Sequence, residues 1–395
     1  MPPIPSRLLV IAIDRLPAWI LPPYGATWVA MPTLTALAGR GLVFDRLYAT
    51  TDDAEGSLFD LIGGLEDAAV VTDDPRLAAA GPMDGLQRRA TVQVVEALPK
   101  ATAEAEPEAT TLARLFAAAA DAVARGSRHL IVHASVLGIA WDAPEDFVAA
   151  YQDPDDPPPP PGAAVPDFVA GADTDPDLLV GIRHVFAAQL TLLDRCLAGL
   201  VEAAGDGPWT VLVVGLRGMG LGLHRCVGPS DMPPYGELIH LPAILVDARG
   251  RMAAQRCAGL ATPADLGATL RELVGNAAPA ELPHEPWQGR SLASLLAEWS
   301  SLGRDRVIAT TRGGDAIVTG GWQAIAPREP ADDASAAGGV RLYAKPDDFF
   351  ELCDVADRCP QEVDELAGLL GMLAAGDPRQ AWTAPLSPAV ERGHG

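Results

Sequence analysis

A cluster of glycines after an apolar run is the first pattern in this sequence that could do chemistry. Residues 211–215 read VLVVG, typical of a strand buried on both faces, and Gly218, Gly220 and Gly222 follow. A strand that ends in glycines is how many phosphate and dinucleotide sites begin. The spacing is not that of the dinucleotide fingerprint, and the expected acidic residue about 20 positions further on is missing. We therefore expect a turn that uses the conformational freedom of glycine.

Carboxylates form a second candidate group. Asp14 follows the apolar run 8–13, and Asp52 and Asp53 directly precede a short helix expected over 56–62. Together these side chains could form a corner that binds a metal ion, because hard cations take carboxylate oxygens. A solvated loop whose carboxylates stand at a helix N-terminus is the simpler interpretation of Asp52 and Asp53, and we favour it.

Hydroxyl groups and histidines complete the candidates. Thr50, Thr51 and Ser57 could act as nucleophiles, but a hydroxyl needs a base or a metal to activate it, and no adjacent residue offers one. His133 lies in a run typical of a buried strand and is expected to be a core histidine. His224 could contact an anion or be packed without a ligand.

The elements that must position these residues alternate between strands and helices, which predicts an α/β fold. Expected strands cover 8–13, 42–47, 68–71, 91–95, 129–135, 211–215 and 241–246, and expected helices cover 32–41, 110–124, 178–204 and 264–274. We expect a large, mostly parallel sheet flanked by helices over residues 1–300. A small C-terminal α+β domain with a short antiparallel sheet and one helix should occupy 301–375, and a tail 376–395.

Composition narrows the function classes. The 395-residue chain has a formal net charge of −23 and no basic stripe, which argues against a nucleic acid or an anionic membrane as partner. Its five cysteines are scattered, which argues against a disulfide framework or a zinc cluster. The first apolar run is too short for a signal peptide, and no run approaches the length of a transmembrane helix. A cytoplasmic location is the resulting expectation.

The order of several motifs resembles the sulfatases of the alkaline phosphatase superfamily. The opening VIAIDRLPAWILPPYGATWVAMPTLTALAGRG resembles the family's first strand, its Tyr-Gly and its P-x-L-x-x-L-A-x-x-G segment. Further matches are WDAPEDFVAAY, the stretch ELIHLPAILVDARG with LATPADLGATLRELVG, WQGRSLASLL and the closing RLYAKPDDFFELCDVADRCPQEVDELAGLL. The resemblance covers nearly the whole chain and implies the sulfatase fold.

The family's nucleophile does not carry over to this chain. Sulfatases convert a Cys or Ser in the motif C-x-P-S-R into formylglycine, and the matching segment here is DDAEGSLFDLIGG. The alignment puts Ala54 at the nucleophile and Leu58 at the arginine, and it leaves Ser57 as the retained motif residue. Shifting the alignment by one residue places Asp53 at the nucleophile instead. The resemblance therefore implies a degenerate active site.

The metal ligands that the resemblance implies are also replaced. The family's opening acidic pair is Asp14 and Arg15 here, so one carboxylate has become a cation. In the second metal motif, Leu216 stands in the place of the aspartate and Arg217 in the place of the histidine. His224 matches a family histidine a few residues further on. Two arginines near the site would repel a divalent cation.

These comparisons predict a sulfatase-like protein that is catalytically inactive and binds an anion or a protein partner through the former active site. No cofactor is expected. The alternative is a divergent sulfuric- or phosphoric-ester hydrolase with altered ligands, for which calcium or another divalent cation would be needed. A purely structural subunit of an oligomer is a third possibility. The binding residues expected at the carboxyl ends of the strands are Asp14, Arg15, Asp53, Arg217 and His224.

Overall fold

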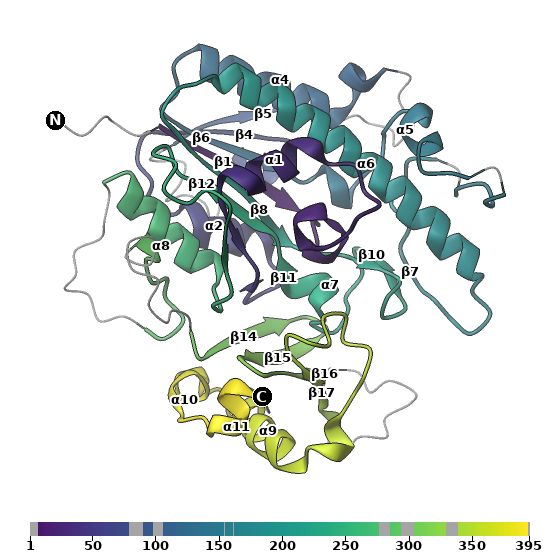
Figure 1. Ribbon diagram of the computed structural model, residues 1–395, viewed down its shortest axis with the longest axis vertical. Helices are drawn as coiled ribbons and strands as arrows, with labels where there is room; N and C mark the ends of the chain where they lie inside the picture. Colours follow the sequence, from purple (N-terminus) through teal and green to yellow (C-terminus); the bar gives the residue numbers. More distant parts are fainter. Residues whose placement is uncertain are drawn as a thin grey trace.

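An eight-stranded mixed sheet forms the centre of the molecule (Figure 1). The structure is a computed structural model that describes residues 7–78, 90–97, 106–153, 155–160, 162–275, 285–293, 304–328 and 339–393. The strands of the large sheet, in spatial order, are β13 (Gln255–Cys257), β2 (Leu42–Phe44), β12 (Ala243–Val246), β8 (Trp209–Arg217), β1 (Arg7–Asp14), β6 (His129–Ala134), β4 (Ala68–Thr72) and β5 (Ala90–Val94). All neighbouring pairs are parallel except the two that β12 makes with β8 and β2.

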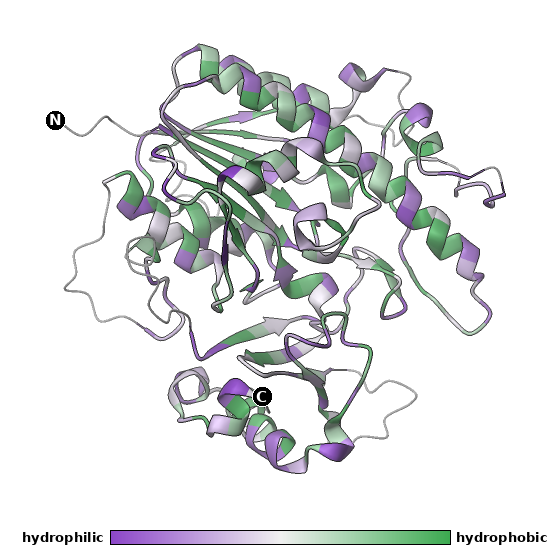
Figure 2. Cartoon of the chain, in the orientation of Figure 1, coloured by the Kyte–Doolittle hydropathy of each residue, from purple (hydrophilic) through white to green (hydrophobic). Residues whose placement is uncertain are grey.

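The alternating side chains of β1 show why this strand is apolar throughout. Leu8, Val10 and Ala12 pack into one hydrophobic core, and Leu9 and Ile11 into another on the opposite face. Helices α2 (Ala54–Ile62) and α8 (Pro263–Leu273) cover the first face, and α1 (Pro32–Arg40), α4 (Thr111–Ala124) and α6 (Pro176–Ala204) cover the second. Because both faces are covered, the central strands are buried on both sides, and they are green along most of their length in Figure 2.

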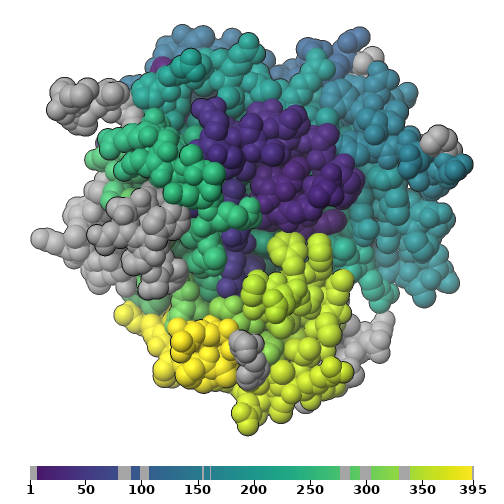
Figure 3. All heavy atoms as spheres, in the orientation of Figure 1, coloured from purple at the N-terminus to yellow at the C-terminus, as the bar shows by residue number. Residues whose placement is uncertain are grey.

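The C-terminal part contains a four-stranded antiparallel sheet and three helices. Its strands are β14 (Arg306–Thr311), β15 (Gly314–Thr319), β16 (Trp322–Pro327) and β17 (Arg341–Ala344), and its helices are α9 (Pro360–Ala374), α10 (Pro378–Thr383) and α11 (Pro388–Arg392). One face of this small sheet packs on the helices through Ile317 and Leu342. The other face joins the core of the large unit through Val307 and Val318. Figure 3 shows the two units in direct contact.

Short elements connect these layers. They comprise β3 (Leu47–Tyr48), β7 (Phe168–Val169), β9 (Gly220–Leu221), β10 (Cys226–Gly228), β11 (His240–Leu241), α5 (Glu145–Ala149), α7 (Gly236–Ile239) and the 3-10 turns η1 (Ala18–Ile20), η2 (Pro22–Tyr24), η3 (Pro75–Ala78), η4 (Pro107–Ala109), η5 (Val136–Gly138) and η8 (Ala356–Arg358). β9, β10 and β7 form a small sheet beside the end of β8.

The predicted fold class is confirmed, and some of the expected elements differ in the structure. The expected strand 42–47 is divided into β2 and β3, because Asp45 and Arg46 form a turn between them. The expected tail 376–395 instead contains α10 and α11, whose Ala381 and Val390 are buried. The expected boundary near residue 300 lies outside the described residues.

Helix α6 also differs from expectation, because it is long and apolar enough to cross a membrane by length and composition alone. In its most apolar 18-residue stretch, however, 61% of the residues are buried inside the protein. Phe186, Leu190 and Leu193 pack against the large sheet and its neighbouring helices. This is the burial expected of a core helix.

Candidate functional site

The candidate site lies where β1 and β8 end. These strands are parallel neighbours, so their carboxyl ends meet at one edge of the large sheet, and Asp14 is paired in register with Arg217. The register shifts between Ile13 and Asp14, which brings the two long side chains opposite each other. The carboxyl edge of such a sheet is where α/β proteins place their ligands.

Arg217 holds Asp14 in a two-pronged ion pair. Its Nε donates to Oδ1 of Asp14 at 2.8 Å and its Nη2 donates to Oδ2 at 3.0 Å, with both side chains largely buried. Nη1 of Arg217 donates to the backbone carbonyl of Asp52 at 2.7 Å. The backbone N–H of Arg15 donates to the same Oδ1 at 3.0 Å. Both carboxylate oxygens are therefore already engaged, by the geometry that makes Arg–carboxylate pairs strong.

The small C-terminal unit adds a third arginine. Arg312, in the turn between β14 and β15, donates from Nε to Oδ2 of Asp52 at 3.1 Å and forms an ion pair with Asp231 at 3.2 Å. The backbone N–H of Thr310 also donates to the carbonyl of Thr50. We call Asp14, Arg15, Asp52, Arg217 and Arg312 the sheet-edge cluster.

Arg15 is the member of the sheet-edge cluster whose charge is least compensated. Its side chain is buried, its φ is +62°, and its guanidinium donates to the carbonyls of Gly218 at 3.5 Å and Pro229 at 3.2 Å. Among the described residues, no carboxylate bonds this guanidinium. Burial and then the nearby positive charge of Arg217 lower the pKa of Arg15 to about 10. An anion placed beside Arg15 would stabilise its buried positive charge.

The glycine turn that follows β8 serves close packing. A Cβ on Gly218 would lie 1.9 Å from the carbonyl oxygen of Glu237, and one on Gly220 would lie 2.5 Å from that of Cys226. Gly222 adopts a φ of +88°. The turn thus lets β9 and β10 fold back closely on β8 and α7. This agrees with the predicted turn that uses the conformational freedom of glycine.

Helix α2 begins beside Arg217, at the place of the missing nucleophile. Asp53 caps the helix by accepting a hydrogen bond from the N–H of Glu55 at 3.1 Å, which agrees with the predicted helix-terminal carboxylate. Ala54, Ser57 and Leu58 are all buried in the hydrophobic part of the helix. The nucleophile position therefore carries only the methyl group of Ala54, and the other two motif positions carry side chains that are buried in the core.

His224 makes no hydrogen bond to the sheet-edge cluster within the part of the chain that the structure describes. Its Nδ1 lies 3.0 Å from Oε2 of Glu237, its Nε2 lies 3.2 Å from the carbonyl oxygen of Glu351, and its ring stacks on Tyr235 with centroids 3.6 Å apart. Both ring nitrogens have protein partners. The predicted grouping of His224 with Asp14 and Arg217 at an anion site is thus unsupported by this geometry.

Sequence reasoning missed the buried polar residues around His224. Glu237 accepts from the backbone of Leu221 at 2.8 Å, and Glu351 accepts from that of Gly236 at 2.9 Å and pairs with Lys345. Burial raises the pKa of Glu351. Only the carboxylates' position in otherwise apolar segments could have signalled these roles.

His133 is the core histidine that the sequence predicted. Its Nδ1 lies 2.9 Å from Oγ1 of Thr72, on the neighbouring strand β4, and burial lowers its pKa. The carboxylate of Asp73, at the end of β4, accepts from the N–H groups of Ser135 at 2.7 Å and Val136 at 2.8 Å. These contacts fasten the ends of β4 and β6 together.

The donor set does not fit the calcium site that the resemblance implies. Asp14 is bonded to a guanidinium through both oxygens, and the apolar Leu216 is fully buried. Among the described residues, no three His, Cys, Asp or Glu side chains are grouped so that they could hold a metal ion. A hard cation needs about six oxygen ligands, and here an arginine stands among the few that are present.

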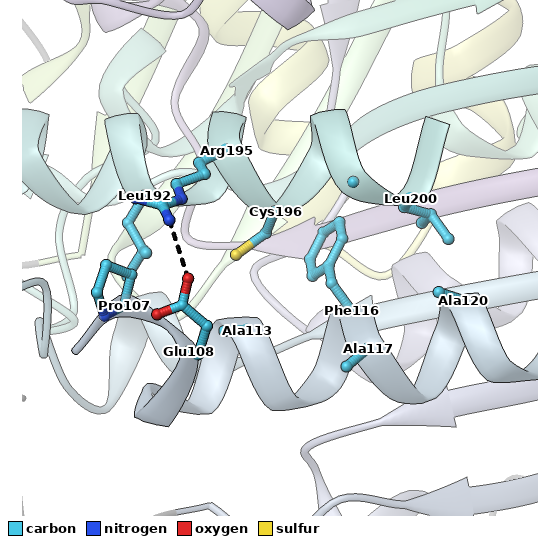
Figure 4. Close-up of a pocket in the computed structure, with 11 residues that line it drawn as sticks. Pro107, Glu108, Ala113, Phe116, Ala117, Ala120, Leu192, Arg195, Cys196 and Leu200 are labelled. Atoms are coloured by element: carbon cyan, nitrogen blue, oxygen red, sulfur yellow. Dashed lines mark hydrogen bonds and ion pairs between the residues drawn. The ribbon is translucent and has the colours of Figure 1, made fainter. Parts of the chain in front are cut away.

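A pocket of about 260 Å³ lies away from the sheet-edge cluster, between α4 and α6 (Figure 4). Phe116, Leu192 and Leu200 give it an apolar lining, and the exposed pair Arg195–Glu108, 2.9 Å apart, stands at one end. Burial raises the pKa of Cys196 to about 12, so this thiol is protonated at neutral pH. No candidate residue from the sequence lines this pocket.

Comparison with known proteins supports the fold. No protein-family model and no curated protein matches the chain. Among solved structures, a phosphonate monoester hydrolase of Agrobacterium radiobacter superposes with a TM-score of 0.69 at 15% identity, covering 95% of this chain and 97% of that one. A putative sulfatase from Bacteroides thetaiotaomicron gives 0.69 at 17% identity, with 98% and 96% covered. A 2-O GAG sulfatase gives 0.68 at 16%, with 99% and 97% covered.

These similarities extend over nearly the whole chain and show its fold. The protein has the fold of these sulfatases and of the phosphonate monoester hydrolase, as the motif order predicted. At such low identity the likeness establishes the fold and leaves the chemistry to the residues of the site.

Proposed function

We propose that this chain is a catalytically inactive sulfatase-like protein that binds a small oxyanion at the sheet-edge cluster. The observation that carries the first half is the two-pronged bond between Arg217 and Asp14, which satisfies the retained carboxylate with an internal cation. Ala54, at the nucleophile position, has no heteroatom that could attack a substrate. A hydrolase that uses these positions would lack both its nucleophile and its Lewis acid.

Arg15 supports the second half of the proposal. Its guanidinium is buried, lies near the like charge of Arg217, and is bonded to two backbone carbonyls. A guanidinium presents five N–H donors in a planar fork, so further donors remain for sulfate or phosphate oxygens. Arg217 uses three of its five N–H groups on Asp14 and Asp52, so it contributes mainly positive charge.

Activity assays test the proposed inactivity. We expect no turnover of an aryl sulfate or an aryl phosphate, with or without added Ca²⁺, Mg²⁺ or Mn²⁺. Ala54→Cys should not restore activity, because Leu58 and Arg217 are still in place. Turnover above background that disappears in Asp14→Ala would instead support the alternative, a divergent ester hydrolase, and bound metal found by elemental analysis would support it further.

Thermal melts in sulfate and phosphate test the anion site. Each anion should raise the melting temperature of the wild-type protein above that seen in chloride of equal ionic strength, because a ligand of the folded state stabilises it. Arg15→Gln should abolish the difference, whereas Arg40→Gln, on an exposed arginine of α1, should keep it. Equal shifts in all three proteins would contradict anion binding at Arg15.

A further inference from the structure

His224 connects the large unit to the C-terminal unit through both nitrogens of its ring. It lies in the loop between β9 and β10, against α7, which Figure 1 places at the boundary with the small sheet. Nδ1 is 3.0 Å from Oε2 of Glu237, on α7, and Nε2 is 3.2 Å from the carbonyl oxygen of Glu351, after β17. The side chain is 9% exposed.

Both partners of this ring are acceptors. The carboxylate of Glu237 already accepts from the backbone N–H groups of Leu221, Leu223 and His224, so it is placed as an anion. The carbonyl of Glu351 has no proton to give. A neutral imidazole carries one N–H and can satisfy only one of the two partners, whereas an imidazolium donates to both.

We infer that His224 is held as an imidazolium and acts as a proton-dependent clasp between the β9–β10 loop and the segment that ends at Glu351. While the proton is present, the ring donates to Glu237 and to the Glu351 carbonyl together. When one proton leaves, one of these two hydrogen bonds is lost. Histidine is the side chain that ordinarily makes this change near neutral pH.

Charged groups from several elements surround the ring of His224 and its partners. Glu237 faces the ring as the anion that favours the imidazolium. Lys345 pairs with the Glu351 carboxylate, and Arg341 bonds the hydroxyl of Tyr235, whose ring stacks on His224. From α6, Arg183 donates to the Leu221 carbonyl at 3.0 Å and also acts on Glu237. These are the charged groups on the elements that pack around the ring.

Release of the clasp has a local consequence. Phe350 precedes Glu351 and packs edge-on against Trp19, with ring centroids 6.2 Å apart, and Trp19 follows the Asp14–Arg15 pair in the chain. The segment around Glu351 keeps its second attachment, from the N–H of Gly236 to the Glu351 carboxylate at 2.9 Å. Opening therefore loosens the contact between Phe350 and Trp19 while the units stay packed through their shared core.

Nitrogen-detected NMR of the full chain, labelled at histidine, tests the proton state directly. At pH 6 both ring nitrogens of His224 should show the shifts of an imidazolium, and His224→Gln identifies the signal. As the proton leaves at higher pH, amide hydrogen exchange at residues 350–353, corrected for the intrinsic pH dependence, should become about fivefold faster. Trp19 fluorescence should change with the same midpoint.

Three variants have distinct expected results. His224→Gln should show the fast-exchanging state at every pH, His129→Gln should behave as the wild type, and Trp19→Phe should remove the fluorescence change. A neutral His224 at pH 6, or exchange that stays constant while His224 loses its proton, would overturn the inference. If His224→Gln does not fold, sequential assignment of the labelled wild-type protein identifies the His224 signal, and the wild-type titration still decides the outcome.

Discussion

Arg217 and Asp14 face each other from the ends of two parallel strands, with Nε to Oδ1 at 2.8 Å and Nη2 to Oδ2 at 3.0 Å. The pair neutralises a carboxylate that is 5% exposed. The sequence resemblance to sulfatases predicts a metal motif at the position of Arg217. Here the guanidinium supplies the positive charge, and it also bonds the chain just before α2 through the carbonyl of Asp52.

Removing one partner of this pair should destabilise the protein strongly. Arg217→Gln leaves the Asp14 carboxylate buried without its cation, so we expect a loss of about 3–5 kcal/mol in the free energy of unfolding. Replacing both residues, as Asp14→Asn with Arg217→Gln, should recover part of that loss because no charge is left unpaired. Urea denaturation of the three proteins measures the difference.

Arg195→Gln is the matched control for this prediction. It removes an arginine from an exposed pair with Glu108, where the side chains are 58% and 70% accessible, so its cost should be at most about 1 kcal/mol. If Arg217→Gln costs no more than Arg195→Gln, the pair at the sheet edge does not hold the site together.

Gly218 should be intolerant of even one methyl group. Its missing Cβ would lie 1.9 Å from the carbonyl oxygen of Glu237, so Gly218→Ala must displace α7 and should cost about 3 kcal/mol or more. Gly39→Ala is the control, because Gly39 is an exposed residue of α1 and a Cβ added there would meet nothing within 4 Å. That change should be neutral or stabilise by about 0.5–1 kcal/mol. Comparable losses in the two variants, measured by thermal and urea melts, would refute the packing role of the glycine turn.

Most of the fold could be predicted because its signals are local. The apolar runs around Val10 and Val213 are continuous because both faces of the large sheet are covered. This pattern can be recognised in the sequence without knowing which elements pack on the strands. The direction of β12 could not be predicted from such a local pattern. Ile244 pairs antiparallel with both Val213 and Val43, and only the path of the connecting loops decides that.

The candidate site was predicted in part. The sequence predicted that Asp14, Arg15 and Arg217 lie close together, because parallel strands end at a shared edge of the sheet and because the motif order agrees. The partner of each guanidinium did not follow, because Arg312 and Asp52 come from segments 260 positions apart. The partners of His224 did not follow either, because Glu237 is 13 positions away in the chain and Glu351 is 127 positions away, in the C-terminal unit.

His240 should make the protein less stable in acid. It is buried against Tyr48, and its Nε2 lies 2.8 Å from the carbonyl oxygen of Asp45, so the neutral ring donates there. Burial lowers its pKa from 6.5 to about 3. Above pH 6.5 the ring is neutral in both states. Between pH 6.5 and 3 the unfolded chain binds a proton that the folded protein excludes, so this residue should remove stability with a slope approaching 1.4 kcal/mol per pH unit.

His240→Gln isolates this contribution, because glutamine can still donate to the Asp45 carbonyl but does not titrate. The free energy of unfolding of the variant, measured in urea at intervals between pH 7 and pH 4, should fall less steeply than that of the wild type. His129→Gln, at the start of β6, serves as the control and should leave the slope unchanged. An unchanged slope in His240→Gln would mean that the ring is protonated in the folded protein.

A carboxylate in place of Arg217 should turn the ion pair into a cation site. Arg217→Asp removes the guanidinium from both oxygens of Asp14 and leaves two carboxylates at the sheet edge, with the carbonyl of Asp52 released beside them. The variant should be less stable than the wild type without metal, because like charges are buried together. Calcium should then restore stability.

With the dissociation constant of about 1 mM that weak oxygen sites show, 10 mM Ca²⁺ should add about 1.4 kcal/mol to the free energy of unfolding. The wild-type protein and Arg217→Gln should gain nothing beyond the effect of ionic strength, which an equivalent amount of NaCl reproduces. Equal stabilisation of the wild type by Ca²⁺ would show that Asp14 is accessible to a cation while Arg217 is present. In that case the guanidinium does not take the place of the metal, and the hydrolase alternative would become the better explanation of the site.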